Sequence, residues 1–303
     1  MGCVSSSGSE MVVPPAALSE NSSAHERLIE RAAAWSVTTD DVFETPGSLI
    51  AYGRRTSGPV VLKIVKRPGD EWHSGAVLNE FGGHGVVRVY EHTGGAALLE
   101  RLRPGNSLVD LTLSGRDDEA TGHIAGVIRA MTSAPVRGSS AHATVQDWGK
   151  GFAWYAATGD RRISSDLVSH AHELYDELCG SQSTVRLLHG DLQHSNIRFD
   201  ERRGWVAIDP KGVIGETEYE IGAALRNPRE APSTFTAPAT IARRIRRLSG
   251  DLALDATRVL EWAFAQAVLS AIWVIEDGEP FDAAEPAMIL AETMRRMLPS
   301  FSS

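Results

Sequence analysis

The sequence predicts an α+β fold in two lobes, a small β-rich first lobe and a larger, mainly helical second lobe. From about residue 41 to residue 102, short β-branched runs alternate with glycine-containing turns. From about residue 107 onward, apolar residues follow helical spacing. Pro104-Gly105 lies between the two patterns, so we expect a hinge at residues 103–106. The expected divisions are a flexible N-terminal arm (1–22), an N-lobe (23–103) and a C-lobe (104–303).

Several elements of the first lobe have sequence signals. Residues 48–52 and 59–65 resemble two strands joined by a turn-forming stretch, which predicts a hairpin. A helix is expected from Asp70-Glu71 through Leu78, ended by Gly82-Gly83. Two further strands are expected, at 85–92 and 96–102.

The second lobe is predicted to be helical with one interruption. The helices are expected at 107–136, 141–158, 164–180 and 259–275. Between residues 185 and 215, two β-like runs, 186–188 and 205–208, are each followed by polar residues. Loops positioned by rigid strands often carry catalytic residues, so this segment is the expected place for chemistry.

Composition excludes several classes of protein. The 303-residue chain has a formal net charge of −9, which argues against nucleic-acid binding. Four arginines between residues 243 and 247 are interpreted as the solvated face of a helix. Two cysteines without metal-binding spacing favour a reducing cytoplasm.

A membrane association is not expected, because no run approaches the roughly 20 apolar residues that a membrane span needs. The opening Met1-Gly2-Cys3 matches a lipidation pattern, but the Ala- and Arg-rich composition indicates a bacterial protein in which that modification is not expected.

The stretch from Leu187 to Ile197 carries the strongest chemical signal. It contains Asp191 and, five residues later, Asn196, and Asp209 follows thirteen residues after that. Phosphoryl transfer to a hydroxyl group needs a carboxylate beside the attacking oxygen and oxygen ligands that hold magnesium against nucleotide phosphates. Asp191 is therefore predicted to be the catalytic base, and Asn196 and Asp209 the magnesium ligands.

The first lobe supplies candidate nucleotide-binding residues. Lys63 lies in an apolar strand, where a cation is costly unless an anion such as a nucleotide phosphate meets it. Glu71 is the expected ion-pair partner that orients Lys63, and Glu80 ranks second because it falls at the end of the helix. Backbone groups of Glu100 and Leu102 are expected to bind an adenine edge.

Together these residues resemble the kinase-like aminoglycoside phosphotransferases, and more closely the branch that contains streptomycin 6-phosphotransferases and hydroxyurea phosphotransferases. The resemblance spans residues 40 to 278. Its motifs are 61–63, 83–89, 98–101, 189–196, 204–212 and 215–216, with weaker support at 227–228 and 262–273.

The resemblance implies a bilobal protein-kinase-like fold that binds ATP and Mg²⁺ and phosphorylates a hydroxyl group, conferring antibiotic resistance. It implies the same roles for Lys63, Glu71, Asp191, Asn196 and Asp209. The expected substrate is a cationic small molecule, streptomycin-like, or hydroxyurea. An alternative in the same class is the kinase of an unidentified sugar metabolite.

One departure from the family concerns the substrate side. Glu220 stands where related sequences usually have Asp, so we expected that side of the site to differ. Glu218, Glu220, Glu276 and Asp277 are candidates for an acidic pocket that would suit a cationic sugar, although acidic surface is also ordinary soluble surface.

Alternative interpretations were weighed. His189, Asp191 and His194 could be metal ligands of a hydrolase, but the sequence shows no further ligands for such a site. His189 is more simply a residue that braces its loop, and Lys211 could face either phosphate or solvent. The main functional alternative is a kinase-shaped protein that binds nucleotide or drug without turnover.

Overall fold

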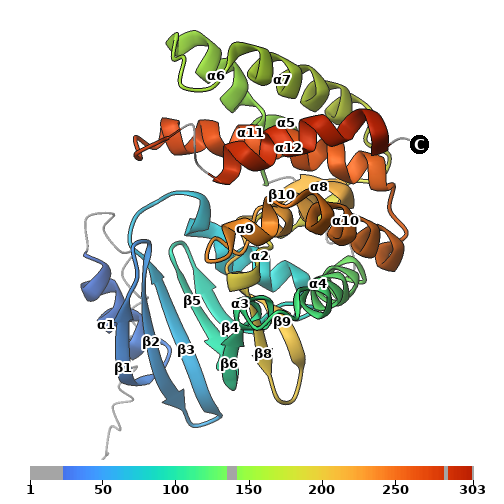
Figure 1. The fold of residues 1–303 in the computed structure, drawn as a ribbon. Coiled ribbons are helices and arrows are strands. Elements are labelled where there is room, and N and C mark those ends of the chain that lie inside the picture. The colour runs from blue at the N-terminus through green and yellow to red at the C-terminus, as the bar shows by residue number, and fades with distance from the viewer. Residues whose placement is uncertain (1–22, 135–141, 283–285, 302–303) are drawn as a thin grey trace, which may run out of the picture.

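The computed structural model describes residues 23–134, 142–282 and 286–301. The predicted arm at 1–22 lies outside this range, as does the expected helical stretch 135–136. Figure 1 shows a β-sheet with a short helix beside it at the lower left, and the remaining helices above and to the right. The predicted change from strands to helices along the chain is confirmed.

Three sheets contain the strands. A five-stranded antiparallel sheet has the order β1-β2-β3-β5-β4, and smaller sheets have the orders β6-β8-β9 and β10-β7. The strands are β1 (Thr38–Glu44), β2 (Ser48–Arg55), β3 (Gly58–Val65), β4 (Val89–Thr93), β5 (Ala96–Glu100), β6 (Pro104–Ser107), β7 (Arg186–Leu188), β8 (Ile197–Asp200), β9 (Gly204–Ala207) and β10 (Val213–Gly215).

The first helices in the chain border the large sheet, and the later ones build the second lobe. They are α1 (Ala24–Ala34), η1 (Asp70–His73), α2 (Ser74–Phe81), α3 (Leu108–Leu113), α4 (Asp117–Thr132), α5 (Val145–Trp148), α6 (Lys150–Thr158), α7 (Ser165–Gly180), η2 (His194–Asn196), α8 (Thr217–Leu225), α9 (Pro232–Phe235), α10 (Pro238–Leu252), α11 (Ala256–Glu276) and α12 (Pro286–Phe301).

The predicted hairpin is confirmed as β2 and β3, which pair from Ser48↔Val65 to Arg55↔Gly58. Gly58 has φ +131°, a backbone conformation that other residues rarely adopt, so it suits this turn. Alternate side chains of both strands, including Leu49 and Leu62, are fully buried against α1 and β5. This packing fixes Lys63, the neighbour of Leu62, on the opposite face of the sheet.

Two predicted helices are each broken into two. The stretch 107–136 contains α3 and α4, separated at Ser114 to Arg116, where Gly115 has φ +82°. The stretch 141–158 contains α5 and α6, which meet at Gly149. A side chain at Gly149 would lie 2.6 Å from the Tyr175 ring, so close packing explains the glycine there.

The expected hinge at 103–106 contains strand β6. β6 pairs with β8, so the chain passes here from the five-stranded sheet into the three-stranded sheet without a free linker. Arg203, in the turn between β8 and β9, reaches the first lobe. It donates to the carbonyl oxygens of Gly83 and Val86 and pairs with Glu100. The lobes are therefore connected by hydrogen bonds as well as by the chain.

The second lobe is built around α11, as predicted for residues 259–275. The expectation that no run is apolar enough to span a membrane is wrong, because α11 has the length and composition of such a span. However, 72% of its apolar window is buried inside the protein, as expected for a core helix. The arginine cluster at 243–247 is not wholly solvated: Arg244 is buried and pairs with Asp117 of α4 at 2.6 Å. That ion pair joins α10 to α4, which periodicity alone did not predict.

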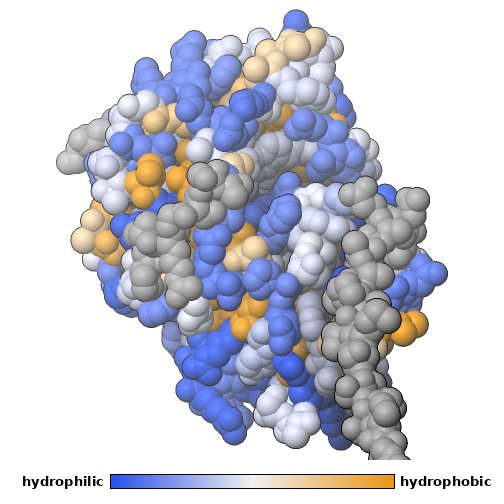
Figure 2. All heavy atoms as spheres, turned by 180° about the vertical axis from the view of Figure 1, so that it is seen from behind, coloured by the Kyte–Doolittle hydropathy of each residue, from blue (hydrophilic) through white to orange (hydrophobic). Residues whose placement is uncertain are grey.

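The surface is mixed in character. Figure 2 shows the face opposite to that of Figure 1, where hydrophilic side chains predominate and apolar ones form small separate groups. This face therefore has the character of an ordinary solvated surface.

Candidate active site

The loop after β7 holds Asp191 in a fixed orientation. The Asp191 Oδ2 atom accepts hydrogen bonds from the side-chain amides of Gln193 and Asn196, both at 3.2 Å. Among the described residues, no hydrogen bond to Oδ1 is found. One carboxylate oxygen is thus anchored and the other is left to accept a proton from an incoming hydroxyl group.

His189 braces this loop, as the sequence predicted. Its Nδ1 atom accepts from the Asp191 amide at 3.2 Å, and its Nε2 atom lies 2.8 Å from the carbonyl oxygen of Ile208. Burial lowers the pKa of His189, so its ring is neutral and donates to Ile208 from Nε2. Both ring nitrogens are used, which argues against His189 as a metal ligand.

His194 is also no metal ligand in the described structure. It is fully buried, and burial together with Arg244 lowers its pKa to about 3. Among the described residues it belongs to no cluster of His, Cys, Asp and Glu that could hold a metal ion.

The backbone next to Asp209 is joined to Asn196: the amide of Ile208, which precedes Asp209, donates to the Asn196 carbonyl oxygen at 2.8 Å. Asp209 has φ +57°, a conformation that is uncommon outside glycine and that often marks functional positions. The Asn196 amide nitrogen is occupied by Asp191, which leaves Oδ1 as its available donor to a cation.

Lys63 connects the two lobes electrostatically. Its Nζ lies 2.7 Å from Glu71 Oε2 and 2.8 Å from Asp209 Oδ1. Burial lowers the pKa of Lys63, but the two carboxylates outweigh it, so the pKa is raised overall and the side chain is charged. Glu80, the second-ranked partner, instead lies 2.8 Å from His142 Nε2.

A cavity of about 540 Å³ lies between the large sheet and the Asp209 loop. Lys63, Glu71 and Asp209 lie at one part of its wall, and Glu100 and Leu102 also line it. The Glu100 amide already donates to the Arg88 carbonyl oxygen at 3.0 Å. An adenine contact at Glu100 would therefore use its carbonyl oxygen.

The structure corrects the interpretation of Glu220 as a substrate-pocket residue. Its carboxylate is buried beneath the Asp191 loop and accepts from the amides of His189 at 2.6 Å and Gly190 at 3.0 Å. Burial raises the pKa of Glu220 to about 7, against the lowering effect of these amides. Glu220 thus holds the Asp191 loop, and it lines neither of the two cavities described in this section.

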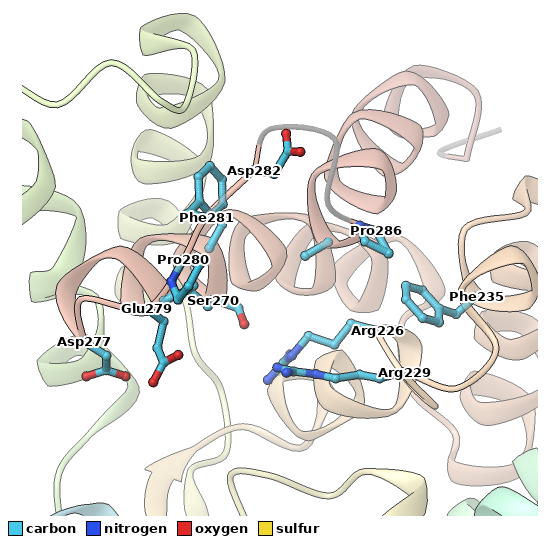
Figure 3. Close-up of a pocket in the computed structure, with 13 residues that line it drawn as sticks. Arg226, Arg229, Phe235, Ser270, Asp277, Glu279, Pro280, Phe281, Asp282 and Pro286 are labelled. Atoms are coloured by element: carbon cyan, nitrogen blue, oxygen red, sulfur yellow. The ribbon is translucent and has the colours of Figure 1, made fainter.

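A second cavity, of about 880 Å³, lies among α8, α11, α12 and the segment that follows α11 (Figure 3). Arg226 and Arg229 point into it from the end of α8, and Asp277 and Glu279 lie across from them. Of the four acidic residues expected at a substrate pocket, Asp277 lines this cavity, whereas Glu218 and Glu276 do not. The sequence analysis did not single out either arginine.

The donor atoms available for a metal are few and hard. Among the described residues, no cluster of three or more His, Cys, Asp or Glu side chains could hold a metal by itself. One carboxylate (Asp209) and one amide oxygen (Asn196) fit Mg²⁺, which usually takes one or two protein oxygens together with phosphates and water. These residues fit a nucleotide-bound magnesium ion better than a resident metal centre.

Comparison with known proteins decides the family. Residues 34–278 match the family model described as aminoglycoside/hydroxyurea antibiotic resistance kinase. The chain belongs to this family. Its membership confirms the resemblance found in the sequence motifs.

Curated relatives of this kinase family have different acceptors in their names. The chain is 30% identical over 285 residues to streptomycin 6-kinase of Streptomyces glaucescens, covering 89% of this chain and 88% of that protein. It is also 30% identical to streptomycin 3''-kinase of Klebsiella pneumoniae (80% and 91% covered) and to hydroxyurea phosphotransferase of Kitasatospora aureofaciens (75% and 71% covered).

Solved structures show the same fold at low identity. Aminoglycoside phosphotransferase APH(4)-Ia, in a ternary complex with ADP and hygromycin B, aligns with a TM-score of 0.63 at 16% identity, over 92% of this chain and 98% of that one. Choline kinase LicA of Streptococcus pneumoniae aligns with a TM-score of 0.58 at 14% identity, over 92% and 99%. The predicted protein-kinase-like fold of this resistance-kinase family member is thus confirmed.

Proposed function

We propose that this chain transfers the γ-phosphoryl group of ATP to a hydroxyl group of a streptomycin-like aminoglycoside and so inactivates the antibiotic. The observation that carries the proposal is a chain of contacts: Lys63 pairs with Asp209, the amide of Ile208 beside Asp209 donates to the Asn196 carbonyl oxygen, and the Asn196 side chain donates to Asp191. Asp209 lines the smaller of the two cavities described above, and Arg226 lines the larger one. In this proposal the smaller cavity takes the phosphate donor and the larger one takes the acceptor.

The residues have distinct roles in this proposal. Lys63, held by Glu71, binds the α- and β-phosphates, and the backbones of Glu100 and Leu102 bind adenine. Asn196 and Asp209 hold Mg²⁺, which when bound neutralises charge on the phosphates. The nucleotide in the APH(4)-Ia complex supports an adenine nucleotide as donor.

The chemical step is an in-line displacement. Asp191 Oδ1 accepts the hydroxyl proton of the acceptor, whose oxygen forms a bond to the γ-phosphorus as the bond to the ADP oxygen breaks. The proton then passes from Asp191 to solvent. Gln193 and Asn196 keep Asp191 in place throughout, because they hold its other oxygen.

The size of the larger cavity favours an antibiotic-sized acceptor. A volume of about 880 Å³ lies in the range of drug-sized ligand sites, whereas hydroxyurea has only a handful of non-hydrogen atoms. Asp277 and Glu279 offer carboxylates to the cationic groups of an aminoglycoside. ATP as donor also favours the cytoplasm as the site of action.

Mass spectrometry tests the proposal directly. The full chain is incubated with Mg²⁺ and ATP and, separately, with streptomycin, other aminoglycosides and hydroxyurea, and each product is examined for a phosphate adduct. We expect an adduct on streptomycin and little on hydroxyurea. Nucleotide binding without an adduct on any compound would instead support a binding protein without turnover.

A further inference from the structure

Arg226 and Arg229 form a cationic floor in the acceptor cavity that the roles above leave unexplained. Figure 3 shows both guanidinium groups directed into the cavity, away from the ribbon that carries them. A cation at the floor of a pocket for a cationic antibiotic is unexpected, because like charges repel. A group other than the acceptor's cations must therefore interact favourably with these two guanidinium groups.

Arg226 is held in place by buried neighbours. Its Nη1 donates to Gln266 Oε1 at 3.1 Å, and Gln266 Nε2 donates to the Tyr219 carbonyl oxygen at 2.6 Å. Gln266 is itself buried and lies so close to Gly222 that a side chain there would meet it at 2.3 Å. The position of Arg226 is therefore built into α8 and α11 and does not depend on a ligand.

Neither arginine has a carboxylate within salt-bridge distance among the described residues of the chain. Burial lowers the pKa of Arg226, nearby Asp191 opposes this effect, and Arg229 adds to it by charge repulsion. A guanidinium group remains charged under these conditions. Arg226 is partly buried without a paired anion, and exposed Arg229 lies beside it, so a bound anion would relieve the cost of desolvating Arg226 and the repulsion between the two cations.

We propose that Arg226 and Arg229 bind the phosphoryl group as it reaches the acceptor, and the phosphate of the product after transfer. This inference rests on the proposed phosphotransferase function. Contacts join Arg226 to the Asp191 loop: Arg226 donates to Gln266, and Gln266 donates to the Tyr219 carbonyl oxygen. The next residue, Glu220, accepts from the amides of His189 and Gly190, directly before Asp191. Asp191 lies beside the attacking oxygen in the proposed function, so the transferred group arrives on the side of the cavity where Arg226 is fixed. Guanidinium groups match phosphate geometry and stabilise charge on a transferring phosphoryl group.

An anionic group on the acceptor itself is the competing occupant. In that case the arginines would bind the acceptor before the reaction and would have no role in phosphoryl transfer. The anchoring of Arg226 beside the helix that holds the Asp191 loop favours the phosphoryl group, since remote acceptor groups would extend toward Asp277 and Glu279 at the other side of the cavity.

Kinetics provides the first half of the test. Arg226→Gln should lower kcat by about 10²- to 10³-fold while the KM for ATP changes less than about twofold, because the contact forms mainly in the transition state. Arg226→Lys should recover part of the loss. Arg229→Gln should lower kcat less, since Arg229 is exposed. Arg161→Gln, which removes an exposed arginine from a different loop, should leave kcat unchanged.

Phosphate binding provides the second half and does not require turnover. Inorganic phosphate is titrated calorimetrically into the full chain loaded with Mg²⁺ and ADP. We expect the Arg226→Gln and Arg229→Gln variants to bind phosphate at least about tenfold more weakly than wild type, and Arg161→Gln to match wild type. If no acceptor is ever phosphorylated, the proposed function fails, while this titration still reports on the arginines.

Two results would overturn the inference. The first is unchanged phosphate affinity in both arginine variants, or no phosphate binding by the wild type. The second is a raised KM for the acceptor with kcat unchanged, which would assign the arginines to the acceptor itself. Thermal melting checks that each variant is folded, and exposed Arg229 gives a readout even if Arg226→Gln does not fold.

Discussion

The nucleotide-side cavity and the acceptor-side cavity described above differ in how their charges are paired. On the nucleotide side, Lys63 is paired with both Glu71 and Asp209 at less than 3 Å. On the acceptor side, Arg226 and Arg229 have no carboxylate partner among the described residues, and Asp277 and Glu279 lie apart from them across the cavity. The nucleotide side is complete without its ligand, whereas the acceptor side is not.

This difference corresponds to the two ligands: the nucleotide is the same for all kinases of this type, whereas the acceptor differs between them. Every kinase of this type must bind the same nucleotide, so its binding residues can be organised in advance by the fold. The acceptors named for the relatives differ, from streptomycin phosphorylated at two positions to hydroxyurea. Substitutions on the two sides should therefore have different kinetic signatures.

The largest effect is expected for Asp191→Ala. Turnover should fall by about 10³- to 10⁴-fold with nearly unchanged ATP affinity, because the base acts on the acceptor and not on the nucleotide. Steady-state rates and a nucleotide titration measure the two quantities. A variant with near-normal turnover would remove Asp191 from the role of base.

Lys63→Met and Asp209→Ala should act on the nucleotide side, each lowering kcat/KM for Mg²⁺-ATP on the order of a hundredfold. Lys150→Met is a matched control, because Lys150 is an exposed lysine that pairs only with Asp147 of the same turn in the described structure. Titration with a non-hydrolysable ATP analogue is the measurement. Equal affinities in all the variants would contradict the assigned binding roles.

Glu220 should make stability depend on pH. Its folded-state pKa of about 7 exceeds the ordinary 4.5, so the native state binds the proton more tightly and loses stability as pH rises from about 4.5 to 7. A shift of this size corresponds to a loss on the order of 3 kcal/mol.

Urea unfolding of wild type and Glu220→Gln at pH 5 and pH 8 measures this effect, since the variant cannot titrate. From pH 5 to pH 8, the unfolding free energy of wild type should fall relative to that of the variant. Parallel pH dependence in both proteins would show that Glu220 does not titrate in this range.

The smallest effect is expected at the acidic side of the acceptor cavity. Asp277→Asn and Glu279→Gln should each raise the KM for a cationic aminoglycoside about two- to fivefold, because exposed charge pairs contribute little and are screened by salt. The KM for ATP should not change. Identical acceptor KM values at low salt would show that the carboxylates do not contact the substrate.

The sequence predicted the Lys63–Glu71 ion pair and the proximity of Asn196 to Asp191 because these residues belong to local motifs. Asp191 and Asn196 share one loop, and Lys63 neighbours strand residues whose alternation is visible in the chain. The acceptor side depends on long-range packing: Arg226 is positioned by Gln266, forty residues later, and no local pattern signals that contact.

Other errors had signals that were overlooked. Ser23 and Glu26 form a capping box that marks the start of α1, and Gly115 and Gly149 mark the breaks in two expected helices. The burial of Glu220 had no such signal, because an acidic residue in a helix is ordinarily exposed. Only the packing of α8 beneath the Asp191 loop directs that carboxylate inward.

The bridge from Lys63 to Asp209 has a consequence for ligand selection. In this ion pair the charges of Lys63 and Asp209 neutralise each other. A nucleotide without metal would bring its negative charge close to the Asp209 carboxylate, and the two would repel. A cation without nucleotide would bind weakly, because Lys63 already neutralises that carboxylate. When the cation and the nucleotide bind together, the cation pairs with Asp209 and the phosphates pair with Lys63, so both charges keep a partner. The cleft should therefore discriminate in favour of the metal–nucleotide complex over either component alone.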